Sequence, residues 1–365
     1  MSDKLRVGLL FGGKSAEHEI SLLSAKNVFE ALDRNKYDPV LIGIDKNGHW
    51  HLGEASRFLL NGDDPERIAL DTSGSESVAL TPESNGRLRT LDDGRLGQSV
   101  DVVFPILHGP LGEDGTVQGL LRLARVPFVG AGVLGSAVGM DKDVMKRLLR
   151  DAGIPGPDFK VFRRGESIGY DALHQALGSP LFVKPANMGS SVGISRVTDK
   201  AAFERAVNEA FRYDSKIVIE TAVQGREIEC AVLGNDDPQA SVPGEIIPRD
   251  GFYSYAAKYL DENGARLDAP ASLDAATIGR IQALAVRTFK TLCCEGMARV
   301  DMFLRADGTL LVNEINTLPG FTRISMYPRL WALSGLAYPK LIDRLIELAL
   351  ERHRGESALV TTQAD

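Results

Sequence analysis

The chain has 365 residues, which at about 150 residues per domain predicts two or three domains. Hydrophobic residues make up 44% and charged residues 25%, which is typical of a globular protein and excludes disordered, collagen-like and disulfide-scaffold chains. The 42 basic and 49 acidic residues give a net charge of -7, so no overall positive field attracts a nucleic-acid backbone. We therefore expect no nucleic-acid partner.

Cysteine usage and hydropathy indicate a cytoplasmic protein without membrane attachment. Cys230, Cys293 and Cys294 lack metal-ligand spacing and indicate reduced thiols. The longest charge-free apolar stretch, residues 126–140, contains four glycines and is too short to span a bilayer. The first residues carry no signal-peptide cleavage pattern, so we interpret them as mature cytosolic sequence.

The amino-terminal part is predicted to be an α/β domain with a parallel sheet, ending near residue 130. Its expected elements are, in chain order, a strand at 5–11, a helix at 19–32, strands at 40–44 and 100–107, and a helix at 113–125. Between them, residues 53–97 are rich in Ser, Gly, Asp and Asn, which predicts a surface loop or hairpin insertion.

The rest of the chain predicts two further domains, 131–223 and 224–365. The first has an α+β pattern: a helix at 141–152, strands at 180–185, 192–197 and 216–223, and a helix at 199–213. The second contains a strand at 227–233, a polar loop at 249–270, a helix at 272–292, a strand pair around Asp307 and Gly308, and helices from 328 to 354.

Two glycine motifs match phosphate-binding patterns. Residues 8–15, GLLFGGKS, satisfy the P-loop pattern, but the three residues after the first glycine are the predicted strand itself, so the match is interpreted as accidental. Gly130, Gly132 and Gly135 satisfy the dinucleotide fingerprint, but no acidic residue stands at the end of a following strand. This second match keeps a nicotinamide-dependent oxidoreductase as an alternative.

The segment RVDMFLRADGTLLVNEIN, residues 299–316, predicts a β-hairpin. A two-residue turn at Asp307-Gly308 places Asp301 opposite Glu314. Two carboxylates in these positions repel each other, so a cation is expected between them. Mg²⁺ suits the pair because it prefers carboxylate, water and phosphate oxygens.

The same register places Arg299 opposite Asn316, on the face of the two acids. The residues expected on the opposite, buried face are Val300, Leu304, Leu311 and Ile315. The alternative interpretation is a solvated charged hairpin whose acids are balanced by Arg299.

The segment LFVKPANMGSSVGI, residues 181–194, has the composition of a phosphate-binding loop. Lys184 leaves an apolar strand, and the small residues after it offer N-H groups and hydroxyls to phosphates. An ordinary turn beside a snorkelling lysine is the alternative. Downstream, Glu220 ends one predicted strand and Glu227 begins the next. This placement suits one acid to an adenine amine and the other to the ribose hydroxyls. Either acid taken alone would be interpreted as a surface residue.

Eight stretches between residues 12 and 326 together resemble the D-alanine:D-alanine ligase family of the ATP-grasp superfamily. They are GGKSAEHEIS, LHGPLGEDGTVQG, VGAGVLGSAVGMDK, VKPANMGSSVGI, ETAVQGREIE, AAKY, RVDMF and NEINTLPGFT. The resemblance implies a three-domain ATP-grasp architecture, and the insertion at 53–97 is similar to that of a longer subtype. It also implies ATP-driven ligation of two D-alanines through an acylphosphate, for peptidoglycan precursor synthesis.

The resemblance further implies a role for each matching position. The catalytic residues would be Glu17, Ser190, Tyr259, Arg299, Gly320 and Ser325, and the substrate contacts Glu17, His108, Ser325 and Met326. The ATP-binding residues would be Lys142, Lys184, Ser190, Ser191, Glu220, Ala222, Val223, Glu227 and Lys258. Asp301, Glu314 and Asn316 would hold Mg²⁺, with two ions expected and Mn²⁺ as a substitute.

Three expectations concern the lid, the product and the oligomer. Residues 249–270 have the character of a lid, with Lys258 and Tyr259 at its centre. Within the family, Tyr259 indicates the dipeptide product rather than D-alanyl-D-lactate or D-alanyl-D-serine. The resemblance also implies a homodimer, and a non-catalytic nucleotide-binding regulator remains the alternative to an enzyme.

Overall fold

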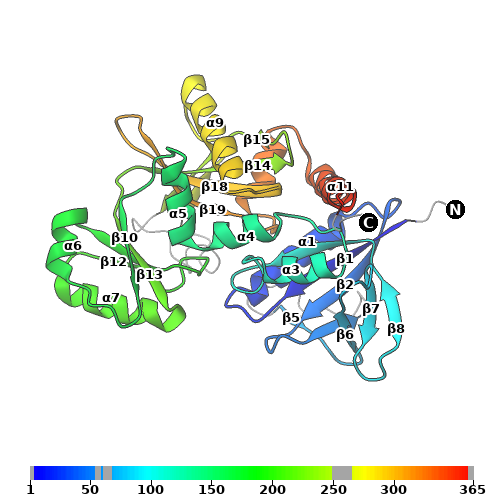
Figure 1. Cartoon of the computed structure of the whole chain (residues 1–365). Coiled ribbons are helices and arrows are strands. Elements are labelled where there is room, and N and C mark those ends of the chain that lie inside the picture. Colours follow the sequence, from blue (N-terminus) through cyan, green and yellow to red (C-terminus); the bar gives the residue numbers. More distant parts are fainter. Residues whose placement is uncertain (1–3, 54–58, 61–67, 249–264, 361–365) are drawn as a thin grey trace.

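The computed structural model describes residues 4–53, 59–60, 68–248 and 265–360. Figure 1 shows a blue and cyan amino-terminal sheet at one end, a green unit at the other, and a yellow and orange sheet between them. Within the described part, the main sheets have seven, four and six strands. The expected combination of α/β and α+β regions is confirmed.

Among the described strands, parallel pairing lies at one end of the amino-terminal sheet, whose last three strands are β2 (Tyr37–Ile44), β1 (Leu5–Gly12) and β9 (Val102–Leu107). Strand β1 pairs in parallel with both β2 and β9. Helix α1 (His18–Ala31) connects β1 to β2. Leu9, in the middle of β1, is fully buried, which is typical of a parallel strand covered on both faces.

In its described residues, the insertion extends this sheet with antiparallel strands, so the hairpin alternative is confirmed and the surface-loop alternative was wrong. Its strands are β3 (Trp50–Gly53), β6 (Glu76–Leu80), β7 (Arg87–Thr90) and β8 (Leu96–Ser99), all antiparallel to their neighbours. A separate pair, β4 (Leu59–Leu60) and β5 (Ala69–Leu70), lies beside it. Alternate residues such as Val78, Leu80 and Leu88 are buried. The sequence therefore contained the apolar-polar alternation of strands, but the many polar residues around it made the pattern weak. The expected parallel sheet is thus a mixed one.

The central unit has its own core. Its sheet, ordered β10-β13-β11-β12, consists of β10 (Phe159–Arg163), β11 (Leu181–Pro185), β12 (Ser195–Val197) and β13 (Lys216–Thr221). Helices α6 (Tyr170–Leu177) and α7 (Lys200–Tyr213) supply apolar side chains to it. The Asp199 side chain accepts a hydrogen bond from the Ala202 N-H and caps α7.

The third sheet carries the predicted hairpin. It contains β14 (Arg226–Gly234), β15 (Gln239–Ala240), β16 (Gly244–Pro248), β17 (Ala265–Asp268), β18 (Gly296–Leu304) and β19 (Leu310–Asn316). Helix α9 (Ala275–Thr291) packs on one face together with α4 (Val133–Met140) and α5 (Lys142–Asp151). The helices cover this face of the hairpin. The cavity-lining residues Arg299, Asp301 and Glu314 therefore lie on its opposite face.

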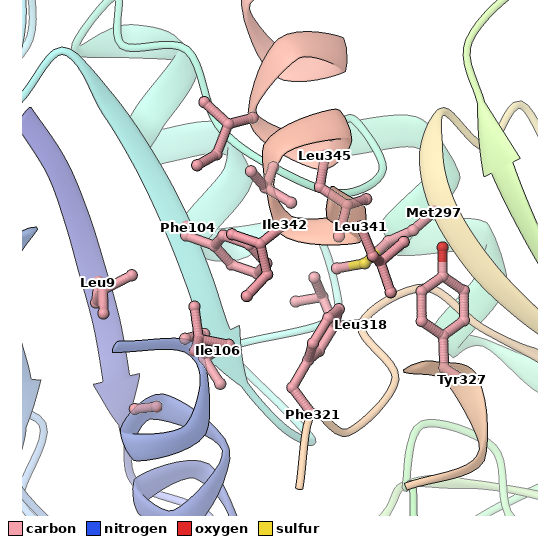
Figure 2. Close-up of a cluster of buried hydrophobic side chains, with 14 of the residues drawn as sticks. Leu9, Phe104, Ile106, Met297, Leu318, Phe321, Tyr327, Leu341, Ile342 and Leu345 are labelled. Carbon is pink, nitrogen blue, oxygen red and sulfur yellow. The ribbon is translucent and has the colours of Figure 1, made fainter. Parts of the chain in front are cut away.

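The two ends of the chain share one hydrophobic core. Helices α10 (Met326–Leu333) and α11 (Tyr338–Ser357) pack with residues of β1 and β9. Figure 2 shows Phe104, Phe321 and Leu341 in this one cluster of buried side chains. The rings of Phe104 and Phe321 meet edge to face with centroids 5.6 Å apart. This core fixes the loop before α10 against the amino-terminal sheet.

Three further features of the described residues are the helix after β9, the cysteines and the character of the longer helices. Helix α3 (Thr116–Leu123) follows β9 as expected. Cys230 and Cys294 are buried and Cys293 is exposed, and all three are free thiols. No helix in the described ranges has the length and apolar character needed to cross a membrane.

Candidate active site

Two adjoining cavities bring together the predicted site residues that fall within the described ranges. The first, of about 120 Å³, is lined by Glu17, His108, Lys142, Ser190, Arg299, Glu314, Asn316, Gly320, Ser325 and Met326, among others. The second, of about 460 Å³, is lined by Lys184, Ser191, Glu220, Ala222, Val223, Glu227, Asp301 and Glu314, among others. Lys258 and Tyr259 lie outside the described residues. Glu314 borders both cavities and therefore marks where they meet.

The carboxylate hairpin has the expected pairing at the acids but a different turn. The pairs Asp301 with Glu314 and Arg299 with Asn316 form as predicted. The turn has three residues, because the Arg305 N-H donates to the Thr309 carbonyl at 2.9 Å, and Gly308 adopts a φ of 82°. A register shift next to Asp301 compensates for the longer turn, so the predicted acid pair was right although its predicted turn was wrong.

Because of the same register shift, one residue predicted on the buried face does not lie there. Val300, Leu304 and Ile315 are buried as predicted, but Leu311 is only half-buried, and Leu310 and Val312 fill the core. The β-bulge at the shift adds one residue to β19. It brings Asn313, which the sequence interpretation missed, to the second cavity beside Glu314.

Asp301 and Arg299 are held together at the junction of the two cavities. The Arg299 Nε and Nη2 atoms donate to the two carboxylate oxygens of Asp301, both at 2.7 Å. Arg299 Nε also lies 3.2 Å from an oxygen of Glu229, and Glu314 lies 3.6 Å from Lys142 Nζ. Arg299 balances Asp301, as the charged-hairpin alternative expected, but Asp301 is mostly buried rather than solvated, and the cation beside Glu314 is Lys142.

Oxygen chemistry at this junction fits Mg²⁺ better than a softer metal. The three predicted ligands offer two carboxylates and one amide oxygen, which are hard donors. The Asn316 Oδ1 atom accepts a hydrogen bond from the Leu318 N-H at 3.0 Å, which fixes its side chain. In the part of the chain described, no group of three or more His, Cys, Asp or Glu residues is arranged to hold a metal.

The glycine loop after β11 reaches across to the amino-terminal domain. The Ser190 hydroxyl donates to Glu17 Oε1, and Lys142 Nζ donates to the Met188 carbonyl at 2.6 Å. Ser190 and Ser191 have φ values of 50° and 61°, a left-handed conformation that is uncommon outside glycine and asparagine. The loop is thus tied at two points, one of them the expected Glu17 to Ser190 contact.

Behind the second cavity, Glu220 lies between two lysines. Lys184 Nζ contacts Glu220 Oε1, and Lys146 Nζ lies 2.8 Å from Glu220 Oε2. Burial alone would raise the pKa of Glu220, but the two ammonium groups lower it to about 2. The carboxylate is therefore ionised at neutral pH and holds Lys184 at the cavity wall.

A second buried pair lies beside the first cavity. His108 Nδ1 lies 3.4 Å from Glu113 Oε1, and both side chains are buried. Burial would lower the pKa of His108, but the carboxylates of Glu113 and Glu17 raise it above its usual value. Burial raises the pKa of Glu113, against the lowering effect of His108.

The loop between β19 and α10 closes the first cavity. The Ser325 hydroxyl accepts a hydrogen bond from the Thr322 N-H at 3.0 Å, and the Phe321 N-H donates to the Ser24 hydroxyl at 3.2 Å. A methyl group on Gly320 would lie 2.9 Å from the Ser325 Oγ atom, closer than real side chains allow. Glycine at this position therefore lets the backbone approach Ser325.

Four residues at the site were missed from the sequence. They are Glu113, Lys146, Glu229 and Asn313. Spacing offered a signal for two of them: Lys146 lies one helical turn after Lys142, and Glu229 lies on the same strand face as Glu227. The other two became visible only with the loop and bulge geometry.

The two accidental glycine matches have structural explanations. Gly8 lies inside β1, where an added methyl group would be 2.9 Å from Val100. Gly135 lies in α4, where an added methyl group would be 2.6 Å from the Cys293 carbonyl. Both glycines allow close packing of the protein against itself, which explains why neither pattern needs a phosphate.

Comparison with known proteins agrees with this geometry. Models of the amino- and carboxy-terminal parts of D-ala D-ala ligases match residues 6–131 and 148–347. The chain is 56% identical to a D-alanine–D-alanine ligase of Shouchella clausii, over 99% of both chains. It is 54% identical to D-alanine–D-alanine ligase A of Escherichia coli K12, over 99% of this chain and all of the relative.

Solved structures give the same result. The D-alanine-D-alanine ligase of Coxiella burnetii has a TM-score of 0.84 and 40% identity, covering 98% of this chain and 97% of that one. The VanG D-Ala:D-Ser ligase of Enterococcus faecalis also has a TM-score of 0.84, with 37% identity over 95% of this chain and all of that one. The two family models and these relatives span nearly the whole sequence, and the chain belongs to the D-alanine–D-alanine ligase family.

Proposed function

We propose that the chain ligates two D-alanines to D-alanyl-D-alanine at the expense of ATP, for peptidoglycan precursor synthesis. Its two adjoining cavities support this activity most directly. Lys184 lines the second cavity, and Lys142 lines the first cavity together with Glu17, Arg299 and Ser325. High identity to relatives with this named activity supports the same conclusion. The nicotinamide alternative lacks support, since Gly135 serves helix packing.

In the first step, a carboxylate oxygen of one D-alanine attacks the γ-phosphorus of ATP and ADP leaves. Glu17 is buried and tied to Ser190, so it is suited to hold the ammonium group of this D-alanine. His108, whose pKa is raised by the nearby carboxylates, lies beside the same position and is suited to the substrate's negative end. Together the two groups orient the amino acid for attack.

ATP is expected to occupy the second cavity and direct its γ-phosphate to the junction. Lys184 and Lys142 are suited to the phosphates, with the N-H groups and hydroxyls of Ser190 and Ser191 beside them. The remaining predicted contacts, Glu220, Ala222, Val223 and Glu227, border the cavity where adenine and ribose would lie. Lys258 of the lid is retained as a predicted phosphate contact.

Mg²⁺ is proposed at the hairpin, held by Asp301, Glu314 and Asn316. When bound, it would neutralise phosphate charge, and Mn²⁺ would substitute for it. Asp301 is paired with Arg299 in this structure, and Arg299 lines the first cavity, where its guanidinium is suited to the transferred phosphoryl group. Two ions remain the expectation.

In the second step, the amine of the other D-alanine attacks the acylphosphate carbonyl. The amine loses a proton, the C-N bond forms, and phosphate leaves with the former carboxylate oxygen. Arg299 and the Gly320 N-H are suited to the developing oxyanion, and Ser325 with Met326 to the second carboxylate. Tyr259 is retained as the predicted partner of Ser190 and Glu17 in closing the site.

Three broader expectations accompany this function. The domain division 1–130, 131–223 and 224–365 is retained as a proposal. Residues 249–270 are retained as the lid, with the correction that Ala265–Asp268 form strand β17 of the third sheet and not a loop. The homodimer rests on family resemblance, and the cytoplasmic location rests on the cysteine usage and the amino-terminal sequence. Sedimentation at micromolar concentration would test the dimer, and a monomeric mass would contradict it.

A coupled assay of ADP release with D-alanine, D-serine and D-lactate tests the activity, with products identified by mass. We expect D-alanine-dependent ADP release and D-alanyl-D-alanine as the product. Preferential formation of D-alanyl-D-serine would contradict the predicted selectivity. ATP binding without turnover would favour the non-catalytic alternative.

A further inference from the structure

Lys146 is a buried cation at the nucleotide site that does not line either cavity. It lies on α5, four residues after Lys142, and its side chain is 4% exposed. Its ammonium group lies 2.8 Å from Glu220 Oε2, although the angles are not those of a directed hydrogen bond. The contact is therefore an ion pair, and Lys146 acts on the cavity only through Glu220.

Glu220 thus serves two lysines at once. Its other oxygen contacts Lys184, which lies on the cavity wall. Two ammonium groups and one carboxylate leave one positive charge in excess. Lys184 is also within 3.4 Å of the Asn313 Oδ1 atom, so it has polar partners on two sides and faces the space where phosphates are expected.

Burial makes this excess charge costly for Lys146. Desolvation lowers the pKa of Lys146, as does nearby Lys184, while Glu220 raises it. A buried charge whose desolvation is unfavourable is typical of functional sites. Phosphate oxygens at Lys184 would remove the excess, because they bring negative charge to the same cluster.

We propose that Lys146 is a positioning residue that keeps Glu220 paired when Lys184 turns to the phosphates of ATP. In the empty site, Lys184 and Lys146 share the carboxylate. Once Lys184 is engaged by phosphate, Lys146 alone balances Glu220. Without Lys146, the same movement would leave a buried carboxylate without a cation, which is strongly unfavourable.

This inference rests on the proposed nucleotide site and makes a specific prediction about phosphates. Lys146→Met should weaken ADP binding by about 10- to 100-fold, the range expected for coupled groups in contact. Adenosine, which has no phosphate, should bind within about twofold of the unchanged chain. Lys160→Met is the matched control, because Lys160 is exposed on β10, whose neighbour β13 carries Glu220.

Calorimetric titration with adenosine and with ADP tests the prediction on the full-length protein. Lys146→Arg should retain most of the ADP affinity because it keeps the charge. Equal weakening of adenosine and ADP, or unchanged ADP affinity in Lys146→Met, would overturn the proposal. Failure of the unchanged chain to bind ADP would instead contradict the proposed function.

A second background keeps the test valid if Lys146→Met does not fold. In the Lys146→Met/Glu220→Gln protein, no carboxylate at position 220 can be left without a cation. This protein is therefore compared with Glu220→Gln alone. Their ADP dissociation constants should agree within about twofold, since Lys146 then has nothing to act through. A tenfold difference between them would show that Lys146 acts independently of Glu220 and would overturn the inference.

Discussion

The two sides of the nucleotide cavity carry their charges in different ways. On one side, the side chains of Glu220, Lys146 and Lys184 are 2%, 4% and 10% exposed and already in contact. On the other side, Asp301 is 14% exposed and paired with Arg299, and Glu314 is 30% exposed and lies beside Lys142. Under the proposals above, the buried side keeps Lys146 as a partner for Glu220 when Lys184 turns to phosphate, whereas the hairpin acids would exchange their cationic side chains for a metal. The buried carboxylate therefore has a second cation in reserve, and the hairpin acids depend on the group that replaces their present partners.

Glu220→Gln should have the largest effect, on the buried side. It leaves two buried lysines without their carboxylate and should lower the free energy of unfolding by about 3–5 kcal/mol. The pKa of Glu220 is lowered from 4.5 to about 2, so its stabilisation is present above pH 4.5 and is lost as pH falls toward 2. Urea unfolding at several pH values measures this difference. A difference that stays constant across that window would contradict the assignment.

Glu314→Gln should affect turnover instead of stability. The hairpin acid is partly exposed, and its loss should reduce D-alanine-dependent ADP release by about 100- to 1,000-fold. Steady-state kinetics at saturating magnesium measure the loss, with the exposed Glu204→Gln as the matched control. ADP formation unaffected by Glu314→Gln would exclude Glu314 from the metal site.

The hairpin also illustrates how far sequence reasoning reached. Alternation and the Asp307-Gly308 signal predicted the acid pair, but the turn gained a residue and a bulge next to Asp301 restored the register. The three-residue turn and the bulge together keep the apolar residues in the core and the two acids opposite each other. No local sequence pattern specifies that a longer turn is compensated by a bulge. Phosphate-loop and hairpin residues were predictable because they lie in short motifs.

The buried side was less predictable for a physical reason. Lys146 and Glu220 come from a helix and a strand far apart in the chain, and their contact depends on how α5 packs beside the central sheet. A lysine one turn after another on a helix is usually solvated, so spacing alone did not select it. The polar insertion likewise concealed antiparallel strands because its buried residues are few and interrupted.

Ser190→Ala tests the contact that connects the two domains at the first cavity. The hydroxyl donates to Glu17, and its loss should reduce kcat/KM for D-alanine by about tenfold. In a Glu17→Gln background the contact is already lost, so Ser190→Ala should lower kcat/KM by less than the loss of about tenfold that it causes alone. Fully additive losses would show that the two residues act separately.

The smallest expected effect is a pH dependence at His108. Because its folded-state pKa is raised above 6.5, its stabilising contribution is present below pH 6.5 and is lost as pH rises through the folded value. Relative to His108→Gln, the melting temperature should be higher by about 2 °C at acidic pH and converge at alkaline pH. Convergence at acidic pH instead would reverse the sign and contradict the pairing with Glu113.

Transfer of oxygen from substrate to phosphate tests the central claim most directly. D-alanine labelled with ¹⁸O in its carboxylate is ligated by the protein, and the released inorganic phosphate is analysed by mass. Attack of the carboxylate on the γ-phosphorus predicts one labelled oxygen in the phosphate for each dipeptide formed. Phosphate without label, formed in step with dipeptide, would contradict the acylphosphate route and the roles assigned to both sides of the cavity.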